Sequence, residues 1–291
     1  MRRRSASEDA SLRKFGSTEY REQEGFVMYV MSLTNLKGGS AKSTTTFNLA
    51  GALVEAGFRV LCIDLDPQKT LGEAFFGVYA NGVDTLSQAL IGDGPIGAAV
   101  RAASFENLQI IPADDGLKGI KSGQTQIEGG ELRLRSGLTR IRMDIDQLND
   151  VHKVDWILID CPPSLDRLTM NALAASDFAL IPVDPGAGGR GALGDTMEYV
   201  YSAQKWYNPT LKVLGLLINN TDPRTVYDQT TEEVVREMYG DLVFNTVVTA
   251  SVRVRESAET QTPLVFCEGA EFTRHANLYR TLRGELLERV G

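Results

Sequence analysis

Short apolar runs alternate along the chain with longer amphipathic stretches. The runs are rich in Val, Ile and Leu at consecutive positions, which is typical of strands buried on both faces of a parallel sheet. Between them, apolar residues recur at helical spacing, as in residues 42–57, where Gly57 suits the end of a helix. We therefore predict the α/β class, with a mostly parallel sheet covered by helices on both faces. The predicted strands lie within residues 26–34, 59–66, 107–113, 155–163, 177–184 and 211–220, and further helices within 131–148 and 271–290.

The pattern begins only after a polar segment of mixed charge. We interpret residues 1–25 as a flexible N-terminal arm and residues 26–291 as a single domain, because no linker or repeat divides the rest. The arm is a disordered extension, or an over-long start with Met28 or Met31 as the true beginning, or a basic segment that contacts an anionic polymer. The arginines of that second interpretation are Arg2, Arg3 and Arg4.

Composition narrows the class of protein. The chain has 291 residues, 43% of them hydrophobic, which allows a sizeable core. Its net charge of −8 excludes a globally basic nucleic-acid binder but leaves room for a local basic patch. No apolar run approaches the roughly 20 residues of a membrane span. The three cysteines and the two histidines, His152 and His275, have no metal-site spacing, and we expect both histidines to be structural.

The stretch TNLKGGSAKSTTTFNLA, residues 34–50, stands between the first predicted strand and the first helix. A general phosphate loop, G-x-x-x-x-G-K-[ST], would place glycines where this chain has Leu36 and Ala41. Lys42 and Ser43 nevertheless follow in register, so we predict that Lys42 neutralises phosphates and that the Ser43 hydroxyl binds Mg²⁺. An ordinary glycine-rich turn is the alternative for this segment taken alone.

Two carboxylates support the phosphate-loop interpretation. Asp160 ends the apolar run WILID, and Asp66 ends VLCIDLD just before Pro67. The carboxyl ends of parallel strands meet at one edge of the sheet, where α/β proteins bind ligands. We therefore predict that Asp66 and Asp160 lie beside the loop and, with Ser43, form a metal site. Turn chemistry before proline is the alternative for Asp66.

Together these motifs resemble the ParA/MinD family of deviant Walker-A ATPases, in particular its ParA (Soj-like) partition branch. The family loop K-G-G-x-G-K-[ST]-T corresponds to residues 37–44, and VLCIDLDPQ and ILIDCPPSLDRLTMNALAASDFALIPV are similar to its later motifs. The resemblance begins near residue 28 and continues to the C-terminus. It implies the P-loop NTPase fold, with ATP and Mg²⁺ as cofactors. The implied nucleotide-binding residues are Lys37, Gly38, Gly39, Ser40, Ala41, Lys42, Ser43, Thr44 and, more weakly, Asn220 with its neighbour Asn219.

The resemblance also implies a mechanism. Lys37, the signature lysine, would reach across an ATP-sandwich homodimer to the partner's phosphates, with Lys42 and Asp66 as the other catalytic residues. The dimer would bind DNA nonspecifically, and a ParB-type centromere-binding partner would stimulate weak intrinsic hydrolysis. The protein would be cytoplasmic and nucleoid-associated, with no membrane contact.

Two departures from the family pattern affect these expectations. Ala41 stands where the family has glycine, and we expect a positive φ there that costs alanine about 1–2 kcal/mol. Phosphate contacts would offset this, or else nucleotide handling is weakened. The second departure is the glycine-rich segment PGAGGRGALGD, residues 185–195, in which Arg190 either contacts a phosphate or partner or is solvated.

The segment SVRVRES carries the predicted DNA-binding residues Arg253 and Arg255. If this segment is extended, both side chains point to one face, and Arg224 would join them in the dimer. Arg253 aligns with a family arginine linked to DNA binding. The alternative for Arg253 is an ion pair with Glu256 or Glu259.

Three other functions compete with partition. A MinD-like membrane-surface ATPase would need a basic C-terminal amphipathic helix, whereas the tail GELLERVG is acidic. A metabolic P-loop enzyme, such as an amide ligase or iron–sulfur reductase, is the second; for the reductase, Cys161 and Cys62 are unsuitably placed for a cluster. A weakly hydrolysing scaffold is the third, if Ala41 disables the loop.

Overall fold

The structure is a computed structural model that describes residues 27–144 except 81, 83, 93 and 126–128, together with residues 154–186 and 189–291. The side chains of residues 142–144, 189 and 190 are likewise outside the description. The predicted arm with Arg2, Arg3 and Arg4, as well as His152 and the Arg190 side chain, therefore lie outside the described part.

An eight-stranded sheet organises the chain, in the order β3-β4-β2-β5-β1-β6-β7-β8. All neighbouring strands run parallel except β3, which pairs antiparallel with β4. The strands are β1 (Tyr29–Leu33), β2 (Val60–Asp64), β3 (Arg101–Ala102), β4 (Leu108–Ile111), β5 (Trp156–Asp160), β6 (Phe178–Val183), β7 (Lys212–Thr221) and β8 (Val248–Thr249). The predicted fold class and its six strands are confirmed; the two-residue edge strands β3 and β8 are too short to give a sequence pattern.

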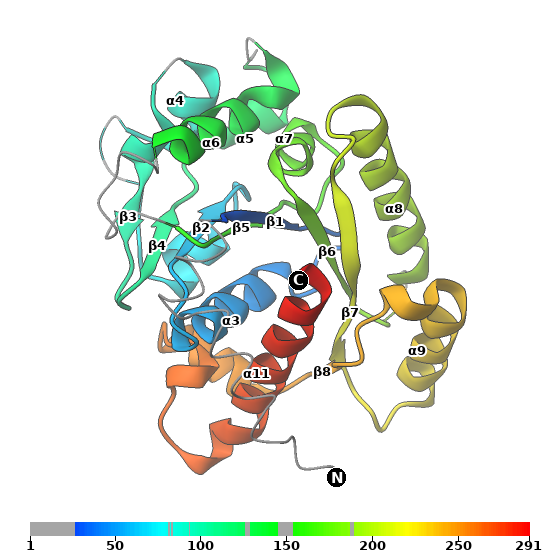
Figure 1. Cartoon of the computed structure of the whole chain (residues 1–291). Helices are drawn as coiled ribbons and strands as arrows, with labels where there is room; N and C mark the ends of the chain where they lie inside the picture. Colours follow the sequence, from blue (N-terminus) through cyan, green and yellow to red (C-terminus); the bar gives the residue numbers. More distant parts are fainter. Residues whose placement is uncertain are drawn as a thin grey trace.

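Helices cover both faces of this sheet, as Figure 1 shows. One face carries α3 (Lys42–Glu55) and α11 (Ala270–Val290), with α10 (Val252–Glu259) beside them. The other face carries α4 (Leu86–Ile91), α5 (Gly116–Lys121), α6 (Arg133–Asp144), α7 (Arg167–Ala175) and α8 (Gly189–Trp206), with α9 (Val226–Tyr239) near the β7 edge. Short irregular helices, η1 (Thr70–Phe75), η2 (Ile96–Ala99), η3 (Gly130–Leu132), η5 (Gly240–Leu242) and η6 (Leu264–Phe266), complete the connections.

Alternation within the central strands divides the core between the two faces. In β5, Trp156 and Leu158 pack toward α3 and α11, whereas Ile157 and Ile159 pack toward α4–α7. Both sets are almost fully buried. This explains the consecutive apolar residues in the sequence, because a strand covered on both faces leaves no side chain for water.

The segment after β8 does not have the extended conformation under which Arg253 and Arg255 would share a face. Residues 252–259 form helix α10 and not an extended segment. The Ser251 side chain caps the helix by accepting a hydrogen bond from the Arg253 N–H (3.1 Å). Since residues two apart on a helix are separated by about 200°, Arg253 and Arg255 do not share a face.

Candidate functional site

The loop between β1 and α3 is fastened to β6 and α8 by its first residues. The Asn35 amide donates to the Pro182 carbonyl (2.7 Å), and the Leu36 N–H donates to the Thr196 hydroxyl (3.1 Å). The Asn35 Oδ1 atom also accepts the Lys37 N–H (2.8 Å). These contacts hold the turn open over the N-terminus of α3, where unpaired N–H groups attract anions.

The tip of this loop has the backbone conformation that its sequence requires. Gly39 has φ 78°, and a Cβ on Gly38 or Gly39 would meet no atom within 4 Å, so the loop surface is clear for a ligand. Ala41 has φ 60° and ψ 33°, which confirms the expected left-handed conformation. This conformation costs an L-residue about 1–2 kcal/mol.

Lys42 lies inside the curve of its own loop. Its Nζ donates to the carbonyls of Asn35 (3.0 Å) and Lys37 (3.5 Å), and the residue is only 6% exposed. Burial lowers the Lys42 pKa, against the opposing effect of nearby Asp160. A buried cation bound only to carbonyl oxygens is well placed to exchange them for phosphate oxygens.

Asp160 ends β5 beneath the loop and is fully buried, yet neither of its carboxylate oxygens has a hydrogen-bond partner among the described residues. Burial raises its pKa to about 7, although the nearby Ser43 hydroxyl and Lys42 favour the ionised form. A buried, unpaired carboxylate beside a hydroxyl fits a Mg²⁺ ion, which takes few protein oxygens and keeps water or phosphate on its other positions. The described residues contain no cluster of three or more His, Cys, Asp or Glu that could hold a metal ion.

Asp66 lies between β2 and η1, close enough to Asp160 to raise the pKa of the Asp160 carboxyl. Its Oδ1 accepts the Gln68 N–H (3.0 Å), and the residue is 9% exposed. Two residues earlier lies Asp64, which no sequence motif indicated; it is a buried carboxylate that accepts the N–H groups of Asp66 (3.0 Å) and Gly72 (2.9 Å). Burial, and then the proximity of Asp160, raises the Asp64 pKa well above its ordinary value.

Lys37 and Lys42 have different surroundings although they belong to one loop. The Lys37 Nζ lies 3.3 Å from an oxygen of Asp184, which directly follows β6. The other Asp184 oxygen accepts the Gly186 N–H (2.7 Å). Asp184 was missed because its role depends on β6 lying next to β1, which no local motif encodes.

The asparagines at the end of β7 also reach this site. Asn219 is buried, and its amide donates to the Thr45 hydroxyl on α3 (2.7 Å). Asn220 is exposed and has φ 57°, with its N–H bonded to Asn219 Oδ1 (2.8 Å). The structure thus brings the end of β7 to the start of α3, so Asn220 can face a ligand while Asn219 fixes the strand.

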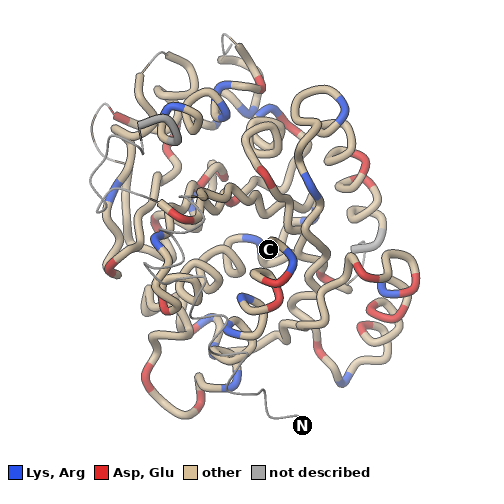
Figure 2. Tube along the Cα trace, viewed as in Figure 1, with Lys and Arg blue, Asp and Glu red and all other residues tan. Residues whose placement is uncertain are grey.

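The three predicted DNA-binding arginines lie outside this site. Arg253 pairs with Glu256 and lies 5.9 Å from the centre of the Phe272 ring. Arg224 is 86% exposed and pairs with Asp222 (2.7 Å). The exposed Arg255 has no ion-pair partner in the described part of the chain. Figure 2 shows basic and acidic residues interspersed along the trace.

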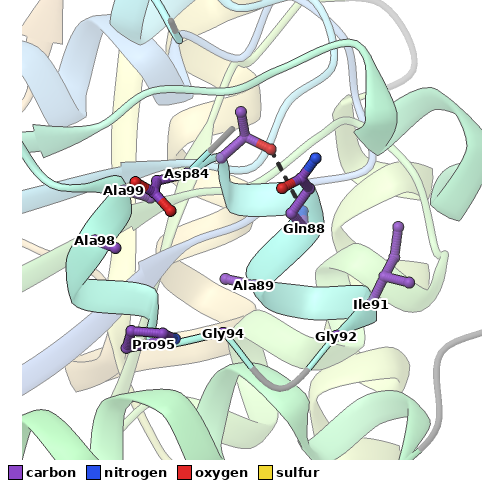
Figure 3. A pocket seen from close by; sticks show the side chains of 10 residues that line it. Asp84, Gln88, Ala89, Ile91, Gly92, Gly94, Pro95, Ala98 and Ala99 are labelled. Carbon is purple, nitrogen blue, oxygen red and sulfur yellow. Dashed lines mark hydrogen bonds between the residues drawn. The ribbon is translucent and has the colours of Figure 1, made fainter. Parts of the chain in front are cut away.

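A separate hollow of about 390 Å³ opens between α4 and η2 (Figure 3). Its walls are mainly small residues and backbone, with Asp84, Thr85 and Gln88 as polar side chains. The described lining residues include no cation to bind phosphate, and none of them belongs to the loops around Lys42, Asp66 or Asp160. The described residues also contain no helix long and apolar enough to cross a membrane.

The comparisons with known proteins agree with this geometry. A family model described as an AAA domain matches residues 28–213. The sporulation initiation inhibitor protein Soj of Bacillus subtilis is 32% identical over 260 residues, which cover 88% of this chain and 97% of Soj. The chromosome partitioning protein ParA of Myxococcus xanthus is 31% identical over 260 residues, covering 89% of this chain and 88% of that protein.

Solved structures show the same fold. Cobyrinic acid a,c-diamide synthase from Mycobacterium smegmatis, with bound ADP and magnesium, superposes with a TM-score of 0.72 at 28% identity and covers 90% of this chain and 95% of its own. The cell division ATPase MinD of Pyrococcus furiosus superposes with a TM-score of 0.68 at 24% identity, covering 90% of this chain and 99% of its own. The chain belongs to the ParA/MinD family of P-loop ATPases.

Proposed function

We propose that this protein is a ParA-type partition ATPase of the deviant Walker-A class. It binds ATP and Mg²⁺, dimerises around the nucleotide, binds DNA nonspecifically as a dimer and hydrolyses ATP slowly until a ParB-type partner stimulates it. It would act in the cytoplasm on the nucleoid. The similarity to ParA and Soj proteins supports the cellular role, and the geometry of the loop supports the chemistry.

The observation that carries the proposal is the contrast between the two loop lysines. Lys42 is enclosed by its own loop, whereas Lys37 is held outside that enclosure by Asp184. A lysine placed at the outer side of a phosphate loop can leave its carboxylate for the phosphates of a second subunit. The exchange replaces one negative partner by another, so dimerisation depends on the charge of the nucleotide.

The remaining residues have separate tasks in this proposal. Ser43 and Asp160 hold Mg²⁺, which would neutralise charge on the phosphates. Asp66 orients the attacking water: its Oδ1 atom is occupied by the Gln68 N–H, and its Oδ2 atom accepts no hydrogen bond from the described residues. Asn220, exposed at the end of β7, contacts the base.

DNA binding in this proposal needs an exchange of partners. Arg253 and Arg224 now pair with Glu256 and Asp222, so a DNA phosphate must displace a carboxylate from each. Both pairs lie at the surface and are at least partly exposed, and surface ion pairs contribute only about 0.2–1 kcal/mol, which makes the exchange feasible. Arg255 needs no such exchange. The dimer would double the number of arginines that one DNA duplex meets.

ATP turnover with and without random duplex DNA tests the proposal and separates it from the alternatives. Turnover that DNA or a ParB-type partner stimulates supports it, and turnover only with an acyl substrate and an amine donor would favour an amide ligase. Asp66→Ala should bind ATP and dimerise but hydrolyse it slowly, whereas Asp160→Ala should weaken Mg²⁺-dependent binding. Parental turnover in Asp66→Ala would reduce Asp66 to a turn residue.

A further inference from the structure

Lys69 occupies a strained position directly after the turn that carries Asp66. It lies in the left-handed region, with φ 59° and ψ 24°, which is uncommon for any residue except glycine, asparagine or aspartate. Its N–H donates to the Asp66 carbonyl (2.8 Å), and its own carbonyl accepts the Glu73 N–H (3.0 Å). Lys69 therefore joins the loop that carries Asp66 to η1, a six-residue π-helix. Strain of this kind persists only where surrounding contacts hold it.

The side chain of Lys69 supplies such contacts. Its Nζ lies 3.3 Å from Glu73 on η1 and 3.3 Å from Asp115, the residue that precedes α5. The lysine side chain is 20% exposed, whereas Asp115 is 72% exposed. Asp115 also pairs with Lys118 within α5 (2.8 Å). Lys69 thus ties the loop after β2 to the helix that follows the neighbouring strand, β4.

Asp64 holds the same loop through separate contacts in the protein interior. Asp64, in the interior, accepts the N–H groups of Asp66 and Gly72, and so fixes both ends of the segment from within. Lys69 fixes the middle of the segment from the surface. The backbone that carries Asp66 is consequently held at three places, two internal and one external.

We propose that Lys69 is a positioning residue that keeps the Asp66 carboxylate in place for ATP hydrolysis, by tying its loop to η1 and α5. The proposal rests on the catalytic role proposed for Asp66. Lys69 need not touch the nucleotide, because its amine is directed to Glu73 and Asp115. A small displacement of a catalytic group can lower a rate by up to about 100-fold, so even a weak surface tie can affect turnover.

The test compares Lys69→Met with Lys118→Met in the full-length chain. Both variants remove a lysine that pairs with Asp115, but only the first releases the Asp66 loop. Hydrogen exchange without nucleotide should show about threefold or faster exchange of the amides of residues 67–75 in Lys69→Met and parental exchange in Lys118→Met. In ATP turnover, Lys69→Met should lose about tenfold in kcat with KM within about twofold of the parental value. Lys69→Arg, which keeps the charge, should restore most of kcat.

The outcomes are distinct. Parental exchange and parental kcat in Lys69→Met would overturn the proposal, as would equal losses in the two methionine variants. A raised KM with unchanged kcat would also overturn it, because Lys69 would then contact the nucleotide. If the parental protein shows no ATP turnover at all, the proposed function fails, whereas the exchange measurement still decides whether Lys69 ties the loop.

Discussion

Replacing Ala41 by glycine should stabilise the protein, although glycine usually weakens the start of a helix. Ala41 has φ 60° and ψ 33°, a conformation that costs an L-residue about 1–2 kcal/mol. Glycine removes that cost but makes the unfolded chain more flexible, which offsets about 0.4–1 kcal/mol. The net gain is about 1 kcal/mol in the free energy of unfolding, or about 2–4 °C in Tm for a chain of this size.

Thermal unfolding followed by circular dichroism measures this gain. The matched control is Ala192→Gly within α8, which introduces glycine at a helical position and should cost about 0.5–1 kcal/mol. A rise in Tm for Ala41→Gly together with a fall in Tm for Ala192→Gly would support this reasoning. An equal loss of Tm in both would show that Ala41 is not left-handed in solution. A tenfold gain in ATP affinity without a change in Tm would show that the strain arises only on binding.

Three further predictions concern other parts of the molecule. Glu285 accepts hydrogen bonds from the N–H groups of Asn245 and Thr246. Burial alone would raise the Glu285 pKa, but these hydrogen bonds outweigh the effect of burial and lower the pKa below its ordinary value of 4.5. Glu285→Gln should therefore cost about 1–3 kcal/mol near pH 7. A carboxyl whose pKa is lower in the folded state stabilises that state at pH values above its unfolded pKa. In urea unfolding, the difference in free energy of unfolding between Glu285→Gln and the parental protein should therefore shrink as the pH falls below about 4.5. A constant difference would contradict this. Asp184→Asn should lower the ATP concentration needed for dimerisation, measured by light scattering, since it releases Lys37; an increase would mean that Asp184 serves the dimer. Arg253→Glu should remove most affinity for random duplex in ATP while dimerisation persists, and parental binding should fall with salt at a log–log slope of about −0.9 per phosphate contacted; unchanged binding would place the DNA surface elsewhere.

The sequence was sufficient for the parts of the site that are local. The loop around Lys42 is contiguous, and Asp160 and Asp66 each follow an apolar run, so strand ends and their carboxylates could be predicted together. The left-handed conformation at Ala41 was expected from the resemblance, because the family has glycine at this position, and the structure confirms it. The roles of these residues remain predictions, but their proximity is a feature of the fold.

Contacts between distant segments could not be predicted in the same way. The pairing of Lys37 with Asp184 depends on β6 lying beside β1, and that of Lys69 with Asp115 depends on β4 lying beside β2. A strand order of this kind is set by the packing of all the helices and strands, and no short sequence motif predicts it.

The helix at residues 252–259 was not predicted for a different reason. The alternation of Val252, Arg253, Val254 and Arg255 is the period of a half-buried strand, whereas only Val254 packs against the core. The Ser251 cap and the contacts of α10 with α11 decide in favour of a helix. In such a short segment, tertiary contacts override a two-residue alternation.

Lys37 is proposed to make dimerisation depend on ATP. The decisive measurement is sedimentation velocity of the parental protein, Lys37→Ala and Lys42→Ala, each with Mg²⁺ and a slowly hydrolysed ATP analogue. We expect a dimer for the parental protein, a nucleotide-bound monomer for Lys37→Ala and a nucleotide-free monomer for Lys42→Ala. A Lys37→Ala variant that forms the dimer at parental nucleotide concentrations would show that Lys37 does not link dimerisation to ATP.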